Sequence, residues 1–244
     1  MNTSNPLEFG GRVILLAGDT GETGKQIAEA FLTAGANVAL CARTAPERLP
    51  EAAGCQAWFT PLAEGNPEHI AAAVDSVFAH YGRIDALVSI PADSPSPGHR
   101  STGSQESDLR RELFTPLHFS QAVNRLMQQQ AEGGSIINIC RADEPLSTSE
   151  PCVLAAACAG LANLGSSLAV EWAPRVRVNT IRIVLPHTEH PEPEQHRRQA
   201  GVGHGTSPAA GARGQLPGIG NTCLFLASTL ASYISGTQLT AANT

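Results

Sequence analysis

The segment from residue 13 to residue 42 constrains the fold more than any other part of the chain. An unbroken apolar run at 13–17 is followed by a glycine-rich turn, and then by an amphipathic helix at 25–34 that ends at Gly35. A second apolar run at 38–42 completes a strand–turn–helix–strand unit. Such a unit predicts two parallel strands joined by a right-handed crossover.

The same alternation continues toward the end of the chain. Further strands are expected at residues 57–60, 84–90, 135–140, 176–184 and 235–240, and further helices at 67–80, 108–130, 150–173 and 222–227. Pro116 predicts a bend within the 108–130 helix. The pattern predicts one α/β domain over residues 1–244, a Rossmann-like, doubly wound parallel sheet with helices on both faces. Residues 93–105 are expected to form a loop, and 186–215 a mobile, lid-like loop.

The composition argues against several classes of protein. The formal net charge of −6 does not favour a nucleic-acid-binding surface. The chain has no run of eighteen apolar residues, so we expect no membrane span. Its first residues lack the basic and apolar regions of a signal peptide. The six cysteines form no Cys-x-x-Cys pair. We therefore expect reduced thiols in a cytoplasmic protein.

Two residue counts limit the chemistry of the chain. The only lysine is Lys25, and the only tyrosines are Tyr81 and Tyr233. Any mechanism that needs a tyrosine and a lysine one helical turn apart is therefore excluded.

Four stretches of sequence together resemble the short-chain dehydrogenase/reductase family. They are GRIDALV at 82–88, GSIINI at 134–139, SLAVEWAP followed by VRVN at 167–179, and the segment from LFLAS at 224–228 to SYISGTQL at 232–239. The resemblance covers nearly the whole chain and implies a Rossmann-like oxidoreductase. In this family a Tyr, with a Lys four residues later, exchanges a proton with the substrate oxygen while hydride moves.

The resemblance also locates the family's catalytic positions in this chain, and all four depart from the pattern. The Tyr position falls on Leu154, the Lys position on Cys158, the polarising Ser on Arg141 and the Asn on Glu112. Leucine has no proton to transfer, and a cysteine cannot hold a cation beside a tyrosine. We therefore expect no catalytic residue in this chain.

The turn after the first strand departs from the family's cofactor motif as well. Its positions are Gly18, Asp19, Gly21, Glu22 and Gly24, and Glu22 stands where a glycine normally lets the backbone approach a pyrophosphate. At ~6 Å and an effective dielectric near 20, each pair of like charges costs roughly 3 kcal/mol. We expect these glycines to serve the turn alone, and this chain to bind no cofactor. Arg43, after the second strand, either meets a 2′-phosphate or is simply solvated.

Several polar groups have both a functional and a structural interpretation. Cys158 with Glu112 and His118 is a conceivable nucleophile set, but cysteine among small residues more often packs as a small apolar side chain. Arg141 either binds an acidic group of a ligand or partner, or fills the vacated pocket through an ion pair with Glu112, which we favour. No rigid element fixes the geometry of the histidines in the 186–215 segment, so we expect no metal site. These histidines are His187, His190, His196 and His204.

The first functional hypothesis is a catalytically inactive subunit. In this hypothesis it assembles with an active, NAD-binding subunit of the same family into a heterotetramer. The resemblance assigns the contacts to the helices at 108–130 and 150–173 and to the C-terminal strand near 236–239. Small residues at 155–160, with Ala162 and Gly165, would let a partner helix approach closely.

Family analogy extends this hypothesis to a partner that oxidises a hydroxyacyl-CoA in aromatic hydrocarbon degradation. Two alternatives remain open. One is a stand-alone ligand-binding or sensing module that takes an acyl-CoA or a nucleotide. The other is an NAD(P)-dependent oxidoreductase with non-standard catalytic residues.

Overall fold

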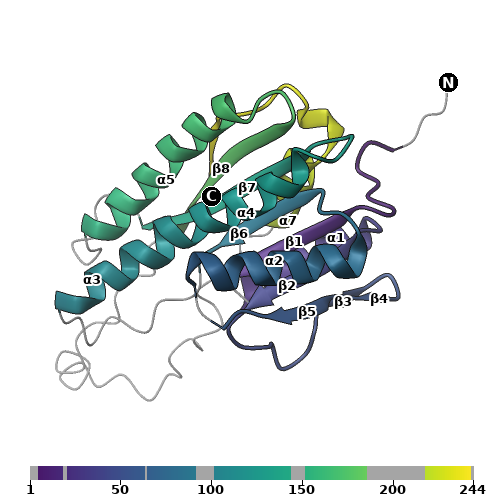
Figure 1. Ribbon diagram of the computed structural model, residues 1–244, viewed down its shortest axis with the longest axis horizontal. Helices are drawn as coiled ribbons and strands as arrows, with labels where there is room; N and C mark the ends of the chain where they lie inside the picture. Colours follow the sequence, from purple (N-terminus) through teal and green to yellow (C-terminus); the bar gives the residue numbers. More distant parts are fainter. Residues whose placement is uncertain are drawn as a thin grey trace, which may run out of the picture.

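A single sheet of seven parallel strands organises the protein (Figure 1). The computed structural model describes residues 5–18, 21–63, 65–91, 102–143, 152–185 and 218–242. The strand order is β5–β2–β1–β6–β7–β8–β9. The strands are β1 (Val13–Gly18), β2 (Asn37–Ala42), β5 (Trp58–Pro61), β6 (Ala86–Ile90), β7 (Gly134–Asp143), β8 (Val176–Leu185) and β9 (Gln238–Ala242). The order reverses between β1 and β6, which confirms the predicted doubly wound fold.

Helices cover both faces of this sheet. The first face packs against α1 (Glu22–Thr33) and α7 (Ile219–Ala227). The other packs against α2 (Pro67–Tyr81), α4 (Thr115–Met127) and α5 (Cys152–Glu171). Successive residues of β1 point into opposite cores, so Val13 to Ala17 are all buried. This two-sided burial explains the unbroken apolar runs in the sequence.

Some boundaries differ from the predicted ones. Helix α1 begins at Glu22, so the end of the predicted turn is already helical, and α3 (Thr102–Leu109) begins inside the predicted loop at 93–105. A hairpin of β3 (Glu51–Ala52) and β4 (Cys55–Gln56), and a short 3-10 helix, η3 (Thr229–Ala231), were not predicted. The predicted lid at 186–215 lies outside the described residues.

The predicted 108–130 helix is interrupted by a π-helical turn, η1 (Arg110–Phe114), between α3 and α4. The Thr115 N–H donates to the Arg110 carbonyl, five residues back. Pro116 follows immediately and has no N–H to donate to the carbonyl of Glu112, so the regular ladder cannot continue there. The bend expected at Pro116 is thus replaced by a wider turn, a feature that often occurs at functional sites.

Helix α5 is long and apolar enough to cross a membrane by length and composition alone, over Val153–Glu171. Leu161 and Leu168 on this helix are buried, and the helix packs on β7 and β8. A place in the core of the fold therefore accounts for the apolar residues on its inner face. Only a third of the stretch is buried, which leaves an exposed apolar face.

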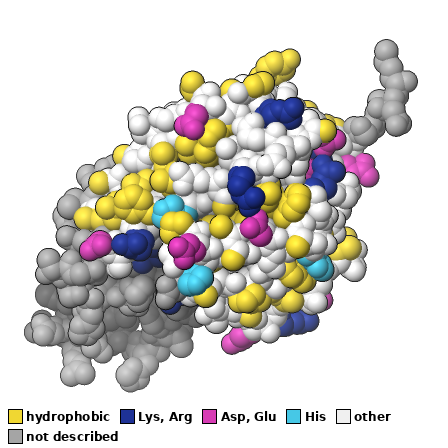
Figure 2. Space-filling model, in the orientation of Figure 1, with side chains coloured by type: hydrophobic (Ala, Val, Ile, Leu, Met, Phe, Trp, Pro, Cys, Tyr) yellow, Lys and Arg dark blue, Asp and Glu magenta, His cyan; other side chains and the backbone are white. Residues whose placement is uncertain are grey.

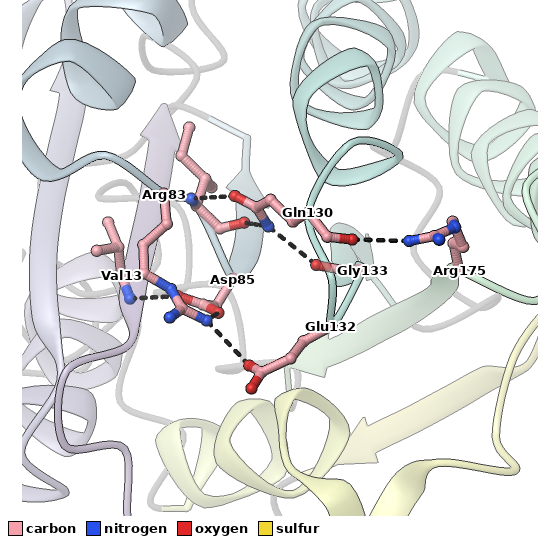
Figure 3. A network of polar contacts seen from close by, with 8 residues as sticks. Val13, Arg83, Asp85, Gln130, Glu132, Gly133 and Arg175 are labelled. Atoms are coloured by element: carbon pink, nitrogen blue, oxygen red, sulfur yellow. Dashed lines mark hydrogen bonds and ion pairs between the residues drawn. The ribbon is translucent and has the colours of Figure 1, made fainter.

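A polar network around Asp85 ties together the amino-terminal edge of the sheet (Figure 3). The Asp85 carboxylate accepts a hydrogen bond from the Val13 backbone at 2.8 Å, and two from the Arg83 guanidinium at 2.5 and 2.8 Å. Arg83 also donates to Glu132 at 2.9 Å. The carboxylate thereby links the start of β1 to the loop that leads into β6.

Gln130 extends this network toward β8 (Figure 3). Its side chain accepts from the Ile84 N–H and donates to the carbonyls of Ile84 and Gly133 at 2.9–3.0 Å. Arg175 donates to the Gln130 carbonyl at 2.7 Å. These hydrogen bonds therefore connect the loops that precede β6, β7 and β8.

We expect Asp85→Ala to lower the free energy of unfolding by about 2–3 kcal/mol, because it removes the acceptor of the Val13 N–H and the two hydrogen bonds that Arg83 donates to Asp85, leaving Arg83 with Glu132 alone. Glu132→Ala is the matched control. Its side chain is 69% exposed, so the loss should stay below about 1 kcal/mol. Urea unfolding of the purified variants measures both, and equal losses would contradict this role for Asp85.

Candidate functional site

A cavity of about 770 Å³ opens at the carboxyl-terminal edge of the sheet, where the strand order reverses. Ligands of doubly wound folds bind at this place. Its lining includes Gly18 and Gly21 from the first turn, Ser89 to Pro91 at the end of β6, and residues of α3, η1 and the start of α4. The structure therefore retains the space in which such a fold holds a ligand.

Gly18 is required by the packing of the strands themselves. Its φ is +113°, and a Cβ atom at this position would lie 1.9 Å from the Ile90 carbonyl oxygen of β6. Gly21 precedes the first residue of α1, and Gly24 is buried within that helix. These contacts support the structural interpretation of Gly18, while Asp19 lies outside the described residues.

The predicted repulsion by Glu22 is weaker in the structure than in the sequence analysis. Its side chain is exposed, accepts a hydrogen bond from Gln26 at 3.3 Å and is absent from the described cavity lining. In bulk water, two like charges ~6 Å apart repel by only roughly 0.7 kcal/mol. Glu22 alone is therefore a small obstacle to an anion in the cavity.

Three arginines give the cavity a positive wall. They are Arg43 after β2, and Arg110 and Arg111 in η1. Arg43 and Arg110 are exposed, and Arg110 forms an ion pair with the exposed Glu106 at 3.4 Å. The described part of the lining contains no aspartate or glutamate. Arg110 is paired with Glu106, and Arg111 with two further carboxylates, so part of this positive charge is offset. The described lining still favours an anionic ligand over a cationic one, because its charged side chains are all positive.

Glu112 and Arg141, at two of the expected catalytic positions, belong to a cluster of four charged side chains that also includes Asp108 and Arg111. Arg111 donates to Glu112 at 3.0 Å and to Asp108 at 2.7 Å, and Arg141 adds an electrostatic attraction to Glu112. The close ion pair of Glu112 is therefore with Arg111, which the sequence analysis did not single out. Arg141 donates to the Pro91 carbonyl, at the cavity wall, at 3.4 Å.

This cluster is poorly solvated. The side chains of Asp108 and Glu112 are 7% and 13% exposed, and that of Arg111 is 23% exposed. Burial raises the pKa of Glu112, whereas Arg111 and Arg141 act in the opposite direction and Asp108 raises it further. Two guanidinium groups thus offset two carboxylates, which is the condition for keeping charges in such a place.

The structure contradicts the expectation of reduced thiols at Cys158. Its sulfur forms a disulfide with Cys140 of β7, and the two Cα atoms are 5.5 Å apart. Both cysteines are buried and pack with Leu161 and Leu113. Cys158 in this state is not a nucleophile. Leu154, the Tyr position, lies one helical turn earlier and is half-buried.

His118 does not join this group in a catalytic arrangement. Its ring stacks on Phe114, with ring centroids 6.5 Å apart, and its buried Nδ1 atom has no hydrogen-bond partner. The Cys158–Glu112–His118 nucleophile set is therefore not assembled. Within the described residues no group of histidine, cysteine and carboxylate side chains could hold a metal ion. The four histidines of 186–215 lie outside those residues.

Both tyrosines lie at the opposite edge of the sheet from the cavity. Tyr81 ends α2, just before β6, and its ring contacts Trp58 and His80. Tyr233 precedes β9 and is fully exposed. Lys25 is on α1, where it pairs with Glu29 at 3.9 Å. The structure therefore places both phenol groups away from the cavity.

Sequence reasoning missed Asp108, Arg111 and Cys140. The first two have a signal, since residues three apart on a helix are neighbours and the run D-L-R-R-E carries opposite charges at that spacing. Cys140 has none, because its distance to Cys158 depends on how α5 crosses β7.

Comparison with known proteins agrees with the architecture. A protein-family model described as enoyl-(acyl carrier protein) reductase matches residues 22–242. D-threitol dehydrogenase of Mycolicibacterium smegmatis is 29% identical over 244 residues, which cover 94% of this chain and 90% of that protein. The 3-oxoacyl-[acyl-carrier-protein] reductase FabG of Escherichia coli is 27% identical and covers 96% of both chains. A hydroxysteroid dehydrogenase structure from Escherichia coli covers 98% of both chains with a TM-score of 0.74 and 24% identity.

The family match extends over most of the chain and the fold agrees with it. The chain therefore belongs to the short-chain dehydrogenase/reductase family of oxidoreductases. Relatives with this scaffold are named as dehydrogenases and reductases, whereas the present chain carries Glu112, Arg141, Leu154 and Cys158 at the catalytic positions.

We expect the stability of the protein relative to Glu112→Gln to fall as pH rises from about 4.5. Because the folded state raises the pKa of Glu112, its protonated form stabilises the protein, and this contribution is lost as pH rises through the folded-state pKa. Denaturant unfolding at several pH values measures the difference. Glu106→Gln, at an exposed side chain, is the control and should unfold like the wild type. A difference for Glu112→Gln that does not change with pH would contradict the prediction.

Proposed function

We propose that this chain is a catalytically inactive member of its family, which acts as a structural subunit rather than as an enzyme. The observation that carries the proposal is the neutral, buried cluster of Asp108, Arg111, Glu112 and Arg141 in place of a proton-transfer site. A carboxylate held by a guanidinium cannot replace a tyrosine whose pKa is lowered by a lysine. With both tyrosines at the far edge of the sheet, the fold provides no phenol near the cavity.

We also propose that this chain does not bind a cofactor in a catalytically competent geometry. The acid that the family usually has at the end of β2 is replaced by Ala42 and Arg43, and the family's Asn-Asn-Ala-Gly stretch is replaced by Ser89-Ile90-Pro91-Ala92, which begins within β6. These replacements, rather than Glu22, are the main support for it. NAD would then be held by the partner subunit.

The exposed face of α5 supports a role in assembly. Its residues between Cys152 and Val170 include no charged side chain, and Ala155, Ala156, Ala159 and Val170 are exposed. Figure 2 shows hydrophobic side chains gathered over this helix. Asn163, Ser166 and Ser167 are exposed as well, so this face is uncharged and mixed in polarity. An exposed helix face without charged side chains is compatible with a protein–protein interface, where charged residues are depleted.

The glycines of α5 serve a different purpose from the one expected. A Cβ at Gly160 would lie 3.6 Å from Leu113, and one at Gly165 only 2.9 Å from the Thr180 hydroxyl. Both glycines therefore face the chain's own core. The alanines of the opposite face are the small residues available to a partner.

The proposed partner is an active, NAD-dependent member of the same family, joined through α4, α5 and the β9 edge in a cytoplasmic heterotetramer. Two members of one family share a helix geometry, so a helix pair from one can pack on that of the other. The heteromeric 2-(α-hydroxybenzyl)succinyl-CoA dehydrogenase, which has a non-catalytic subunit, is an analogy for such an assembly. By the same analogy, the substrate of the partner subunit is a hydroxyacyl-CoA. This step rests on analogy alone.

The cavity favours one alternative function, a stand-alone ligand-binding or sensing module. A volume of about 770 Å³ and a lining with three arginines suit an anionic ligand such as a nucleotide or an acyl-CoA. Nothing comparable favours an oxidoreductase with non-standard groups, because Glu112 is not part of the described cavity lining.

The purified chain should show no turnover of alcohols or ketones with NAD(H) or NADP(H), followed by nicotinamide absorbance. The variant Leu154→Tyr/Cys158→Lys should also remain inactive, because Arg141 and Glu112 still occupy the Ser and Asn positions. Restoring these as well, with Glu112→Asn and Arg141→Ser, is the matched comparison. Turnover by the wild type or by the first variant alone would contradict the proposal.

Native mass spectrometry of the untagged protein from its own host should show a stoichiometric complex with an intact dehydrogenase. Ala159→Arg, on the exposed face of α5, should abolish that complex because it places a charge in an apolar contact. Ala72→Arg, on the exposed face of α2, is the control and should leave it intact. A homo-oligomer that binds a ligand without a partner would instead favour the sensing module.

A further inference from the structure

We propose that Cys140 and Cys158 form a reversible redox link that holds the first half of α5 against β7. Formation of this link does not depend on whether the chain is catalytic. It stands on the position of the two residues. Their Cα atoms are 5.5 Å apart, within the range that a disulfide requires, and their sulfurs are bonded.

The link lies between two parts of the vacated site. Cys140 precedes Arg141 in β7, and Cys158 occupies the family's Lys position in α5. Leu113, the neighbour of Glu112 in η1, packs against the same two cysteines. The bond therefore joins the strand and the helix beside the buried charge cluster, where no lysine or tyrosine ties them together.

A second contact fixes the other half of the helix. Ser166 of α5 donates to the Gly236 carbonyl, just before β9, at 2.9 Å. This contact is independent of the redox state, so loss of the disulfide should loosen the first half of α5 selectively. The exposed alanines Ala155, Ala156 and Ala159 are in that half.

The chemistry is thiol–disulfide exchange with a low-molecular-weight disulfide such as oxidised glutathione. The S–S bond of the reagent breaks, a bond forms between the two Sγ atoms, and the two thiol protons leave with two molecules of reduced reagent. The cysteines lose two electrons and the reagent gains them. A dithiol such as dithiothreitol reverses the step.

The test compares wild-type protein after treatment with oxidised glutathione and after treatment with dithiothreitol. Alkylation under denaturing conditions, read by intact mass, should modify four of the six cysteines in the first sample and all six in the second. Peptide mapping should identify the Cys140–Cys158 pair. Six modified cysteines in the glutathione-treated sample, or a different pair, would overturn the proposal.

The melting temperature supplies the second readout. The link closes a segment of 18 residues, so the reduced form should melt roughly 6–12 °C lower than the oxidised form. Cys158→Ala should lose this redox response, whereas Cys55→Ala, at an exposed free cysteine, should retain it. Equal melting temperatures for the two forms of the wild type would overturn the role of the link, and failure of dithiothreitol to reduce it in the native protein would overturn its reversibility.

Discussion

A parallel sheet gathers the carboxyl ends of its strands at one edge, and the side chains found there share a poorly solvated space with the helices above them. In this protein β7 contributes Arg141 to that space, and the turn η1 contributes Arg111 and Glu112. Charges can be kept in such a place only if they neutralise one another. The pairing of Arg111 with Asp108 and Glu112 meets that requirement, and it determines what else the site can do.

The consequence for chemistry follows from charge balance. A site for hydride transfer needs a group that can gain and lose a proton beside the substrate. Here Glu112 is paired with Arg111 and attracted by Arg141, and the sulfur of Cys158, at the expected Lys position, is bonded to that of Cys140. Under the proposed function, the interactions that stabilise this part of the fold are also the ones that leave it without a proton donor.

The scaffold has nevertheless kept the features that a family member needs for folding. Gly18 is needed because any side chain there would collide with β6. Asp85 accepts the hydrogen bonds that connect the loops at the amino-terminal edge of the sheet. The cavity persists because its walls are the strand ends and turns of the doubly wound fold. Packing thus preserves the shape of the cavity at the switch point, whether or not a cofactor is bound there.

The sequence by itself determined the strand–helix alternation, the doubly wound fold and the absence of a Tyr–Lys pair, because periodicity and residue counts need no coordinates. It also predicted which four residues stand at the family's catalytic positions, from their spacing to the scaffold motifs. Only the tertiary structure decided that Glu112 pairs with Arg111, that Glu22 points into solvent, and that Cys140 meets Cys158. Those outcomes depend on the π-helical turn and on how α5 crosses β7, and both are set by contacts between residues far apart in the chain.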